Sequence, residues 1–324
     1  LVNWRRHPLL HSLLLATLLR LPLLWLPGPG RDEAAYHYWA WHPELFYAPL
    51  LQWMLRLGDL LPVPEILALR LPSLLAGMLV LILVDLRLRA RQAPNTLRWL
   101  CLLALVVSEW QTYTGAILHP DQLMMSCLLL AALAAGAGRV VLFGVALALA
   151  SLAKPTGLLL LPVGWVLAGR LSETAEPRRV FLARLAMAAS LVFLLSRLER
   201  PMVEAMSHFG HMDPSMPWAL RVAGGLVAVL LSGGPLLLLL AASGLGERIT
   251  TLRTRVTSMR PEDAARRREA WSSLSLAAVL LVAFGLAAVL RGQIKANWIL
   301  PAAVLLLPLR SVALLPWLSS AALA

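Results

Sequence analysis

Residues 66–86 read ILALRLPSLLAGMLVLILVDL, and this stretch decides the class of fold. A helix of about 20 mostly apolar residues crosses the hydrocarbon core of a bilayer, so the run has the length and composition of a membrane span. Similar runs recur along the chain, and only 14% of its 324 residues are charged, whereas about 25% is typical of soluble domains. The sequence therefore predicts an all-α, multi-spanning membrane protein.

The apolar runs predict about ten membrane-crossing helices in one transmembrane domain over residues 1–324. The fifth and sixth are short and separated by Lys154-Pro155-Thr156-Gly157, so they could also form one broken helix. Because the chain ends soon after the last run, no carboxyl-terminal soluble domain is expected. The predicted spans are 9–27, 66–86, 99–117, 122–138, 140–153, 156–169, 180–196, 221–243, 272–290 and 298–317.

Basic residues set the expected orientation. The formal net charge is +12, and the basic residues are scattered between apolar runs, unlike the clustered aromatic-basic pattern of a nucleic-acid-binding module. With the amino terminus inside, most of them fall in loops on the inner side of the membrane, as the positive-inside rule requires. Both cysteines lie within apolar runs, so neither a disulfide framework nor a CxxC metal site is expected.

The first outer segment, residues 28–65, does not resemble an ordinary loop. The stretches 34–41 (AAYHYWAW) and 50–57 (LLQWMLRL) are rich in tryptophan and tyrosine and predict two amphipathic helices. Helices of this kind lie in the membrane interface. A pair of them over the outer leaflet can hold a polar site at the level where a lipid headgroup arrives.

Two adjacent carboxylates, Asp32 and Glu33, follow directly after the first predicted span. At the start of an interfacial helix they can act as an N-cap and as favourable charges on the helix dipole. Alternatively, one of them is a general base near the membrane surface. The residues alone leave both interpretations open.

A second polar group lies between the third and fourth predicted spans. His119-Pro120-Asp121 forms a short turn in which Asp121 can cap the fourth helix. The preceding stretch 108–114, SEWQTYT, makes the outer half of the third span polar. Polar groups at that depth need partners or a wet cavity, so the sequence predicts a functional site in this region.

Lys154 is one of two lysines in the chain and lies at the predicted helix break. An ammonium group there is a candidate phosphate ligand, and snorkelling toward the membrane surface is the alternative. A pair of histidines three residues apart is a candidate for a divalent metal site, or equally for binding a phosphate or a sugar. These histidines are His208 and His211, and the further cations that could hold a phosphate are Arg197, Arg200, Arg291 and Lys295.

Six motifs follow one another in a characteristic order: 32–39 (DEAAYHYW), 47–50 (YAPL), 70–77 (RLPSLLAG), 119–121 (HPD), 152–157 (LAKPTG) and 296–301 (ANWILP). Their order resembles that of the bacterial membrane glycosyltransferases of the GT-C type. Within that group the chain is most similar to the protein-mannosyltransferase-like and aminoarabinose-transferase-like families, which use polyprenyl-phosphate sugars. The resemblance covers about residues 8–160 well and the carboxyl half only through its topology and the Asn297-Trp298 element. It departs from the family at Tyr47-Ala48-Pro49, where His-Pro-Pro is common.

The resemblance implies a GT-C fold and direct displacement with inversion at the sugar carbon. It assigns the base to Asp32 or Glu33 and makes Asp121 a helper that binds the acceptor or a metal. Tyr36 and Arg70 belong to the matching motifs and are carried over as donor-binding candidates.

The expected activity is transfer of a sugar from a polyprenyl-phosphate carrier to a lipid, glycan or protein acceptor, at the extracytoplasmic face of a bacterial inner membrane. Lys154 and arginines would stabilise the phosphate charge while the sugar–phosphate bond breaks. A transporter or lipid flippase is the main alternative, although no internal hydropathy repeat supports it. A non-catalytic membrane scaffold would explain the hydrophobicity but not the polar residues.

Overall fold

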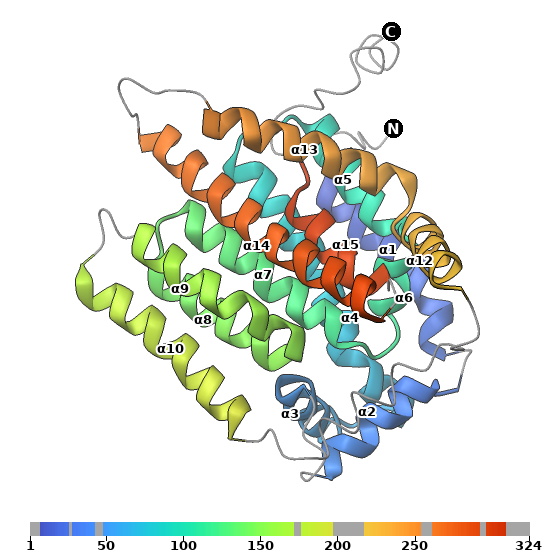
Figure 1. Ribbon diagram of the computed structural model, residues 1–324. Coiled ribbons are helices and arrows are strands. Elements are labelled where there is room, and N and C mark those ends of the chain that lie inside the picture. Colours follow the sequence, from blue (N-terminus) through green and yellow to red (C-terminus); the bar gives the residue numbers. More distant parts are fainter. Residues whose placement is uncertain are drawn as a thin grey trace, which may run out of the picture.

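The computed structural model describes residues 7–25, 28–42, 48–171, 176–196, 217–253, 261–291 and 296–308. Across these ranges the chain forms α-helices and one 3-10 helix, with no strand (Figure 1). The prediction of an all-α fold is confirmed. The helices are α1 (Pro8–Trp25), α2 (Arg31–Trp41), α3 (Pro49–Gly58), α4 (Glu65–Ala90), α5 (Asn95–Val106), α6 (Glu109–Thr114), α7 (Pro120–Gly136), α8 (Val140–Ala153), η2 (Pro155–Leu160), α9 (Leu161–Arg170), α10 (Pro177–Leu195), α12 (Trp218–Gly233), α13 (Pro235–Arg253), α14 (Pro261–Arg291) and α15 (Ala296–Leu305).

Two of the described helices, α1 and α4, are long and apolar enough to cross a membrane alone. A bent pair, Leu226–Gly233 and Leu236–Ile249, adds a third candidate, and four more apolar helices are shorter. Several apolar runs are divided between two helices that are each shorter than a full span. The expected number of about ten membrane-crossing helices therefore stays a prediction.

Two predicted spans are broken at identifiable residues. The run 99–117 divides into α5 and α6 at Ser108, whose side-chain oxygen accepts a hydrogen bond from the Gln111 N–H at 3.3 Å and so starts a new helix. The run 221–243 divides between α12 and α13, which meet at an angle of 97°. Gly234 stands at that corner with a φ of +73°, which favours glycine.

The fifth and sixth predicted spans form two packed helices rather than one broken helix. The chain leaves α8 at Lys154, passes through η2 and returns in α9. A Cβ on Gly157 would lie 2.5 Å from the carbonyl oxygen of Ala150, and one on Gly164 would collide with Leu147. Glycine at both positions therefore lets α9 lie directly against α8.

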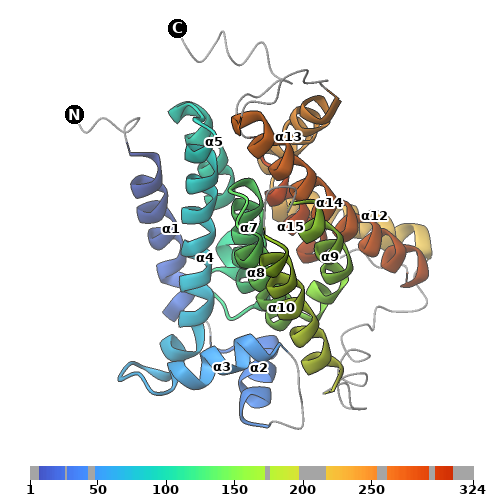
Figure 2. The same cartoon turned by 90° about the vertical axis from the view of Figure 1, so that its left-hand side faces the viewer.

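The two helices predicted in segment 28–65 are present as α2 and α3, and their place in the membrane interface stays a prediction. They lie across one end of the bundle, away from the end where α5 begins (Figure 2). Gln52 Nε2 donates to the Trp39 carbonyl at 3.1 Å, and Arg56 Nε donates to the Ala40 carbonyl at 2.6 Å. These bonds satisfy carbonyls at the carboxyl-terminal end of α2 and hold α2 against α3.

The opposite end of the bundle, here called the arginine-rich end, is formed by the end of α4, the starts of α5, α8, α10 and α14, and the end of α9. Arg87 binds Glu269 and Ser273, which joins α4 to α14. Asp85 is shared by Arg98 at 2.7 Å and Arg89 at 2.6 Å. These ion pairs with carboxylates offset the free-energy cost of removing the guanidinium groups from water.

Candidate functional site

Glu33 and Arg70 form a buried ion pair at the α2–α3 end. Arg70 Nε and Nη2 donate to the two Glu33 carboxylate oxygens at 2.9 and 2.7 Å. The remaining N–H groups of Arg70 donate to the carbonyls of Leu23, Leu24 and Gly28. All five donors of this guanidinium are therefore engaged within the protein, and none is left for a phosphate.

The Glu33 carboxylate also accepts two backbone hydrogen bonds. They come from Leu118 N at 2.9 Å and Gly30 N at 3.0 Å. Burial raises the pKa of this carboxyl, but the bonds from Arg70, Leu118 and Gly30 outweigh burial and hold the pKa below its usual value. Glu33 is thus a fixed anion that joins α2, α4 and the turn before α7.

A second cluster forms around Asp121, which is fully buried. The Lys154 ammonium binds one of its oxygens, and Trp110 Nε1 donates to the other at 3.5 Å. His119 Nδ1 accepts from the Asp121 N–H at 3.3 Å and so caps α7. The prediction that Asp121 caps this helix is wrong, because His119 is the N-cap residue and the Asp121 carboxylate binds Lys154 and Trp110 instead.

His119 lies partly buried between this cluster and α2. Burial lowers the pKa of its imidazole more than the nearby Asp121 raises it, so the ring is neutral at neutral pH. Because Nδ1 accepts a hydrogen bond, the proton of the neutral ring is on Nε2. Tyr36 packs edge-on against the ring, with the centroids 6.3 Å apart. His119 can therefore donate one hydrogen bond but carries no charge.

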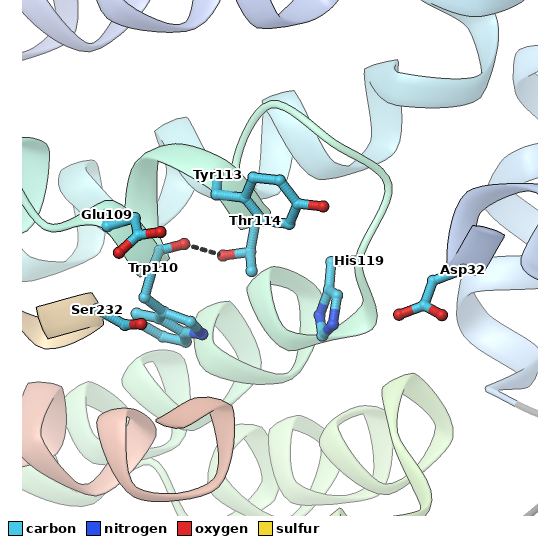
Figure 3. A pocket seen from close by; sticks show the side chains of 7 residues that line it. All are labelled: Asp32, Glu109, Trp110, Tyr113, Thr114, His119 and Ser232. Atoms are coloured by element: carbon cyan, nitrogen blue, oxygen red, sulfur yellow. Dashed lines mark hydrogen bonds between the residues drawn. The ribbon is translucent and has the colours of Figure 1, made fainter. Parts of the chain in front are cut away.

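A cavity of about 230 Å³ opens beside His119 (Figure 3). Asp32 and His119 lie at one end of it, and Glu109 and Ser232 lie at the other. Asp32 makes no hydrogen bond or ion pair with any described residue, in contrast to its neighbour Glu33. The complete lining is Asp32, Glu109, Trp110, Tyr113, Thr114, His119 and Ser232.

The sequence interpretation anticipated most of this lining, since it singled out Asp32, the stretch 108–114 and the turn at His119. It missed Ser232, which α12 brings to the cavity and for which no local sequence signal exists. It also missed Arg20, whose guanidinium lies between Gly77 and Gly115 and donates to the Gln111 carbonyl at 3.1 Å. An arginine in the middle of the first apolar run was the available signal.

Other predicted site residues do not line the cavity or lie outside the described residues. Lys154, Asp121, Tyr36 and Arg70 are buried behind the cavity wall. Arg291 is the last residue of α14. Arg197, Arg200, His208, His211 and Lys295 lie outside the described residues. Within the described ranges, no three His, Cys, Asp or Glu side chains converge closely enough to hold a metal ion.

The helical bundle, with α2 and α3 across one end next to the cavity, has a GT-C-type membrane fold. It matches the crystal structure of ArnT from Cupriavidus metallidurans in the apo state, with a TM-score of 0.58 and 19% identity. The match covers 92% of this chain and 57% of that chain, so the present chain spans little more than half of its length. No protein-family model matches the chain, and the search of curated proteins gives no match.

Proposed function

We propose that this protein transfers a sugar from a polyprenyl-phosphate carrier to an acceptor hydroxyl or amine. The shared fold supports the class of reaction, because the structurally similar ArnT is an aminoarabinose transferase. The single observation that carries the proposal is the Asp32 carboxylate at the start of α2, which lies at the cavity without a hydrogen bond or ion pair to any described residue. We assign the base to Asp32 rather than to Glu33, because Glu33 is occupied by Arg70 and two backbone amides.

The proposed step is a direct displacement. Asp32 takes the proton of the acceptor, whose oxygen or nitrogen forms a bond to the anomeric carbon from the face opposite the phosphate. The bond from that carbon to the phosphate oxygen breaks, and its electron pair leaves with the polyprenyl phosphate. The configuration of the sugar carbon is therefore inverted.

Groups near the cavity can stabilise the leaving phosphate. His119 Nε2–H is a neutral donor at the same end of the cavity as Asp32. The Lys154 ammonium has three N–H donors, and Asp121 engages it through one carboxylate oxygen. We keep Lys154 as the proposed phosphate ligand, with Arg197, Arg200, Arg291 and Lys295 as further candidates. We also keep, as a proposal from the sequence pattern, a divalent metal held by His208 and His211.

The surroundings suit a lipid-linked donor. Trp41 and Trp53, on α2 and α3, are exposed at the end of the bundle that holds the cavity, and tryptophan is enriched at membrane–water interfaces. The polyprenyl tail would remain in the lipid while its phosphate and sugar enter the cavity. We place this end at the extracytoplasmic face of a bacterial inner membrane, with an envelope lipid, glycan or protein as the acceptor.

The test is incubation of the purified chain with a panel of radiolabelled polyprenyl-phosphate sugars and extracted envelope acceptors. We expect release of polyprenyl phosphate and label on the acceptor. Asp32→Asn should lower the rate by about 10²–10⁴-fold. Asp59→Asn is the matched control, because Asp59 lies at the same end, bonded to Trp41, and does not line the cavity. Uptake into vesicles without bond cleavage, or full activity of Asp32→Asn, would contradict the proposal.

A further inference from the structure

Two arginines at the arginine-rich end differ from their neighbours in their partners. Arg87, Arg89, Arg98, Arg179 and Arg266 each form an ion pair with a carboxylate. Arg170 and Arg184 have no carboxylate partner among the described residues. Each lies instead over the face of a tryptophan, Arg170 over Trp271 at 5.7 Å and Arg184 over Trp165 at 5.2 Å from the ring centroid.

The two arginine–tryptophan pairs adjoin each other. The Arg184 guanidinium lies over Gly169, where a Cβ would be 2.9 Å from Nη2, and Gly169 immediately precedes Arg170. A side chain larger than glycine would push the guanidinium away from this position. Arg184, from α10, therefore touches α9 one residue before Arg170, whose own guanidinium reaches α14 at Trp271.

Arg184 Nε donates to the Trp165 carbonyl at 3.4 Å, and no carboxylate of the described residues occupies the remaining N–H groups of either guanidinium. A guanidinium stacked on a ring keeps its N–H edges directed outward in its own plane, where they can bind phosphate oxygens in pairs. Trp165 and Trp271 are themselves 43% and 44% exposed, and tryptophan prefers the level of the lipid headgroups. The site is therefore built for an anion at a membrane surface.

The adjoining surface is apolar. Val166 on α9 and Phe181 and Leu185 on α10 are at least half exposed and lie on the same two helices as Trp165 and Arg184. In a membrane protein such side chains face acyl chains. An apolar surface that continues into two unpaired arginines matches both parts of a phospholipid molecule.

We propose that Arg170 and Arg184, with Trp165 and Trp271, bind the headgroup of an anionic phospholipid in the leaflet at the arginine-rich end. This surface lies at the end of the bundle opposite α2 and α3, so the inference is independent of the sugar-transfer reaction. The phospholipid would be a bound partner that the chain retains, in addition to the diffuse attraction of the basic loops for anionic lipids.

The test is native mass spectrometry of the delipidated chain after addition of phosphatidylglycerol or phosphatidylcholine. The wild-type chain should retain phosphatidylglycerol in preference. Arg170→Gln/Arg184→Gln should weaken that retention about tenfold or more, because the hydrogen bonds from the charged guanidinium groups to the headgroup phosphate are lost. Arg170→Lys/Arg184→Lys keeps both charges and should retain an intermediate amount, because the planar stacking is lost.

The matched control is Arg178→Gln/Arg179→Gln, which removes two exposed arginines at the start of α10 that lie over no tryptophan. We expect the control to change retention less than threefold. If the control and Arg170→Gln/Arg184→Gln lose lipid retention equally, the effect is due to diffuse surface charge and the proposal is overturned. Equal retention of the two lipids by the wild-type chain would overturn it as well.

Discussion

Replacement of Glu33 by glutamine should destabilise the fold far more than replacement of Asp32 by asparagine. The glutamine amide keeps one acceptor oxygen, so two of the four hydrogen bonds to the Glu33 carboxylate are lost, including one from Arg70. Arg70 is then a fully buried cation without an anion. Removal of one partner from a buried ion pair costs about 3–5 kcal/mol. Asp32 has no such partner, and loss of its charge near the start of α2 costs about 0.3–1 kcal/mol.

Equilibrium unfolding of the purified chain in mixed micelles, titrated with a denaturing detergent and followed by tryptophan fluorescence, measures this difference. The double variant Glu33→Gln/Arg70→Met removes both charges and should recover much of the loss, because replacing a whole buried pair is often close to neutral. The reasoning is refuted if Glu33→Gln unfolds like the wild-type chain while sugar transfer is abolished. In that case Glu33 would be the base.

The same pair predicts an acid-dependent loss of stability. The pKa of the Glu33 carboxyl in the folded chain lies below its usual value of 4.5. The pair therefore contributes its full stabilisation above about pH 4.5, and the contribution is lost as the pH falls through the lowered pKa. In the Glu33→Gln variant this part of the pH dependence should be absent when the same unfolding titration is repeated between pH 3 and 7, the range spanning the carboxylate titration.

Three further predictions concern other parts of the chain. Lys154→Met should raise the donor concentration that is needed for half-maximal transfer. If Lys154 only neutralises Asp121, the double variant Lys154→Met/Asp121→Asn should return this concentration to the wild-type value; if Lys154 binds the donor phosphate, it should not. Gly115→Ala should destabilise the chain by about 1–3 kcal/mol in an unfolding titration, because the new methyl group would lie 2.7 Å from Arg20 Cζ; unchanged stability would show that the Arg20 guanidinium moves freely. A cysteine replacing His42 should react with a membrane-impermeant reagent in intact cells, with the parent chain as background, and lack of labelling would overturn the proposed orientation.

The sequence predicted the helical membrane fold, the two helices α2 and α3 and most of the cavity lining, because each depends on local composition or on a short motif. Asp32 and Glu33 illustrate what it could not predict. They are adjacent and chemically alike, and only the position of Arg70, 37 residues along the chain from Glu33, makes one a fixed structural anion and leaves the other unpaired. The break of the third predicted span at Ser108 was equally hidden, since a helix cap within an apolar run leaves the mean hydropathy almost unchanged.

The attachment of Glu33 next to Asp32 also has a mechanical consequence. Any tilt of α2 pivots about the point where Glu33 is fastened to α4 and to the turn before α7. Asp32 is one residue from that pivot, so its lever arm is about 1.5 Å along the helix axis, whereas Trp41 at the far end of α2 has a much longer one. The outer part of α2 can therefore tilt only together with α3, to which Gln52 and Arg56 bind it, while the Asp32 backbone stays close to its place beside His119.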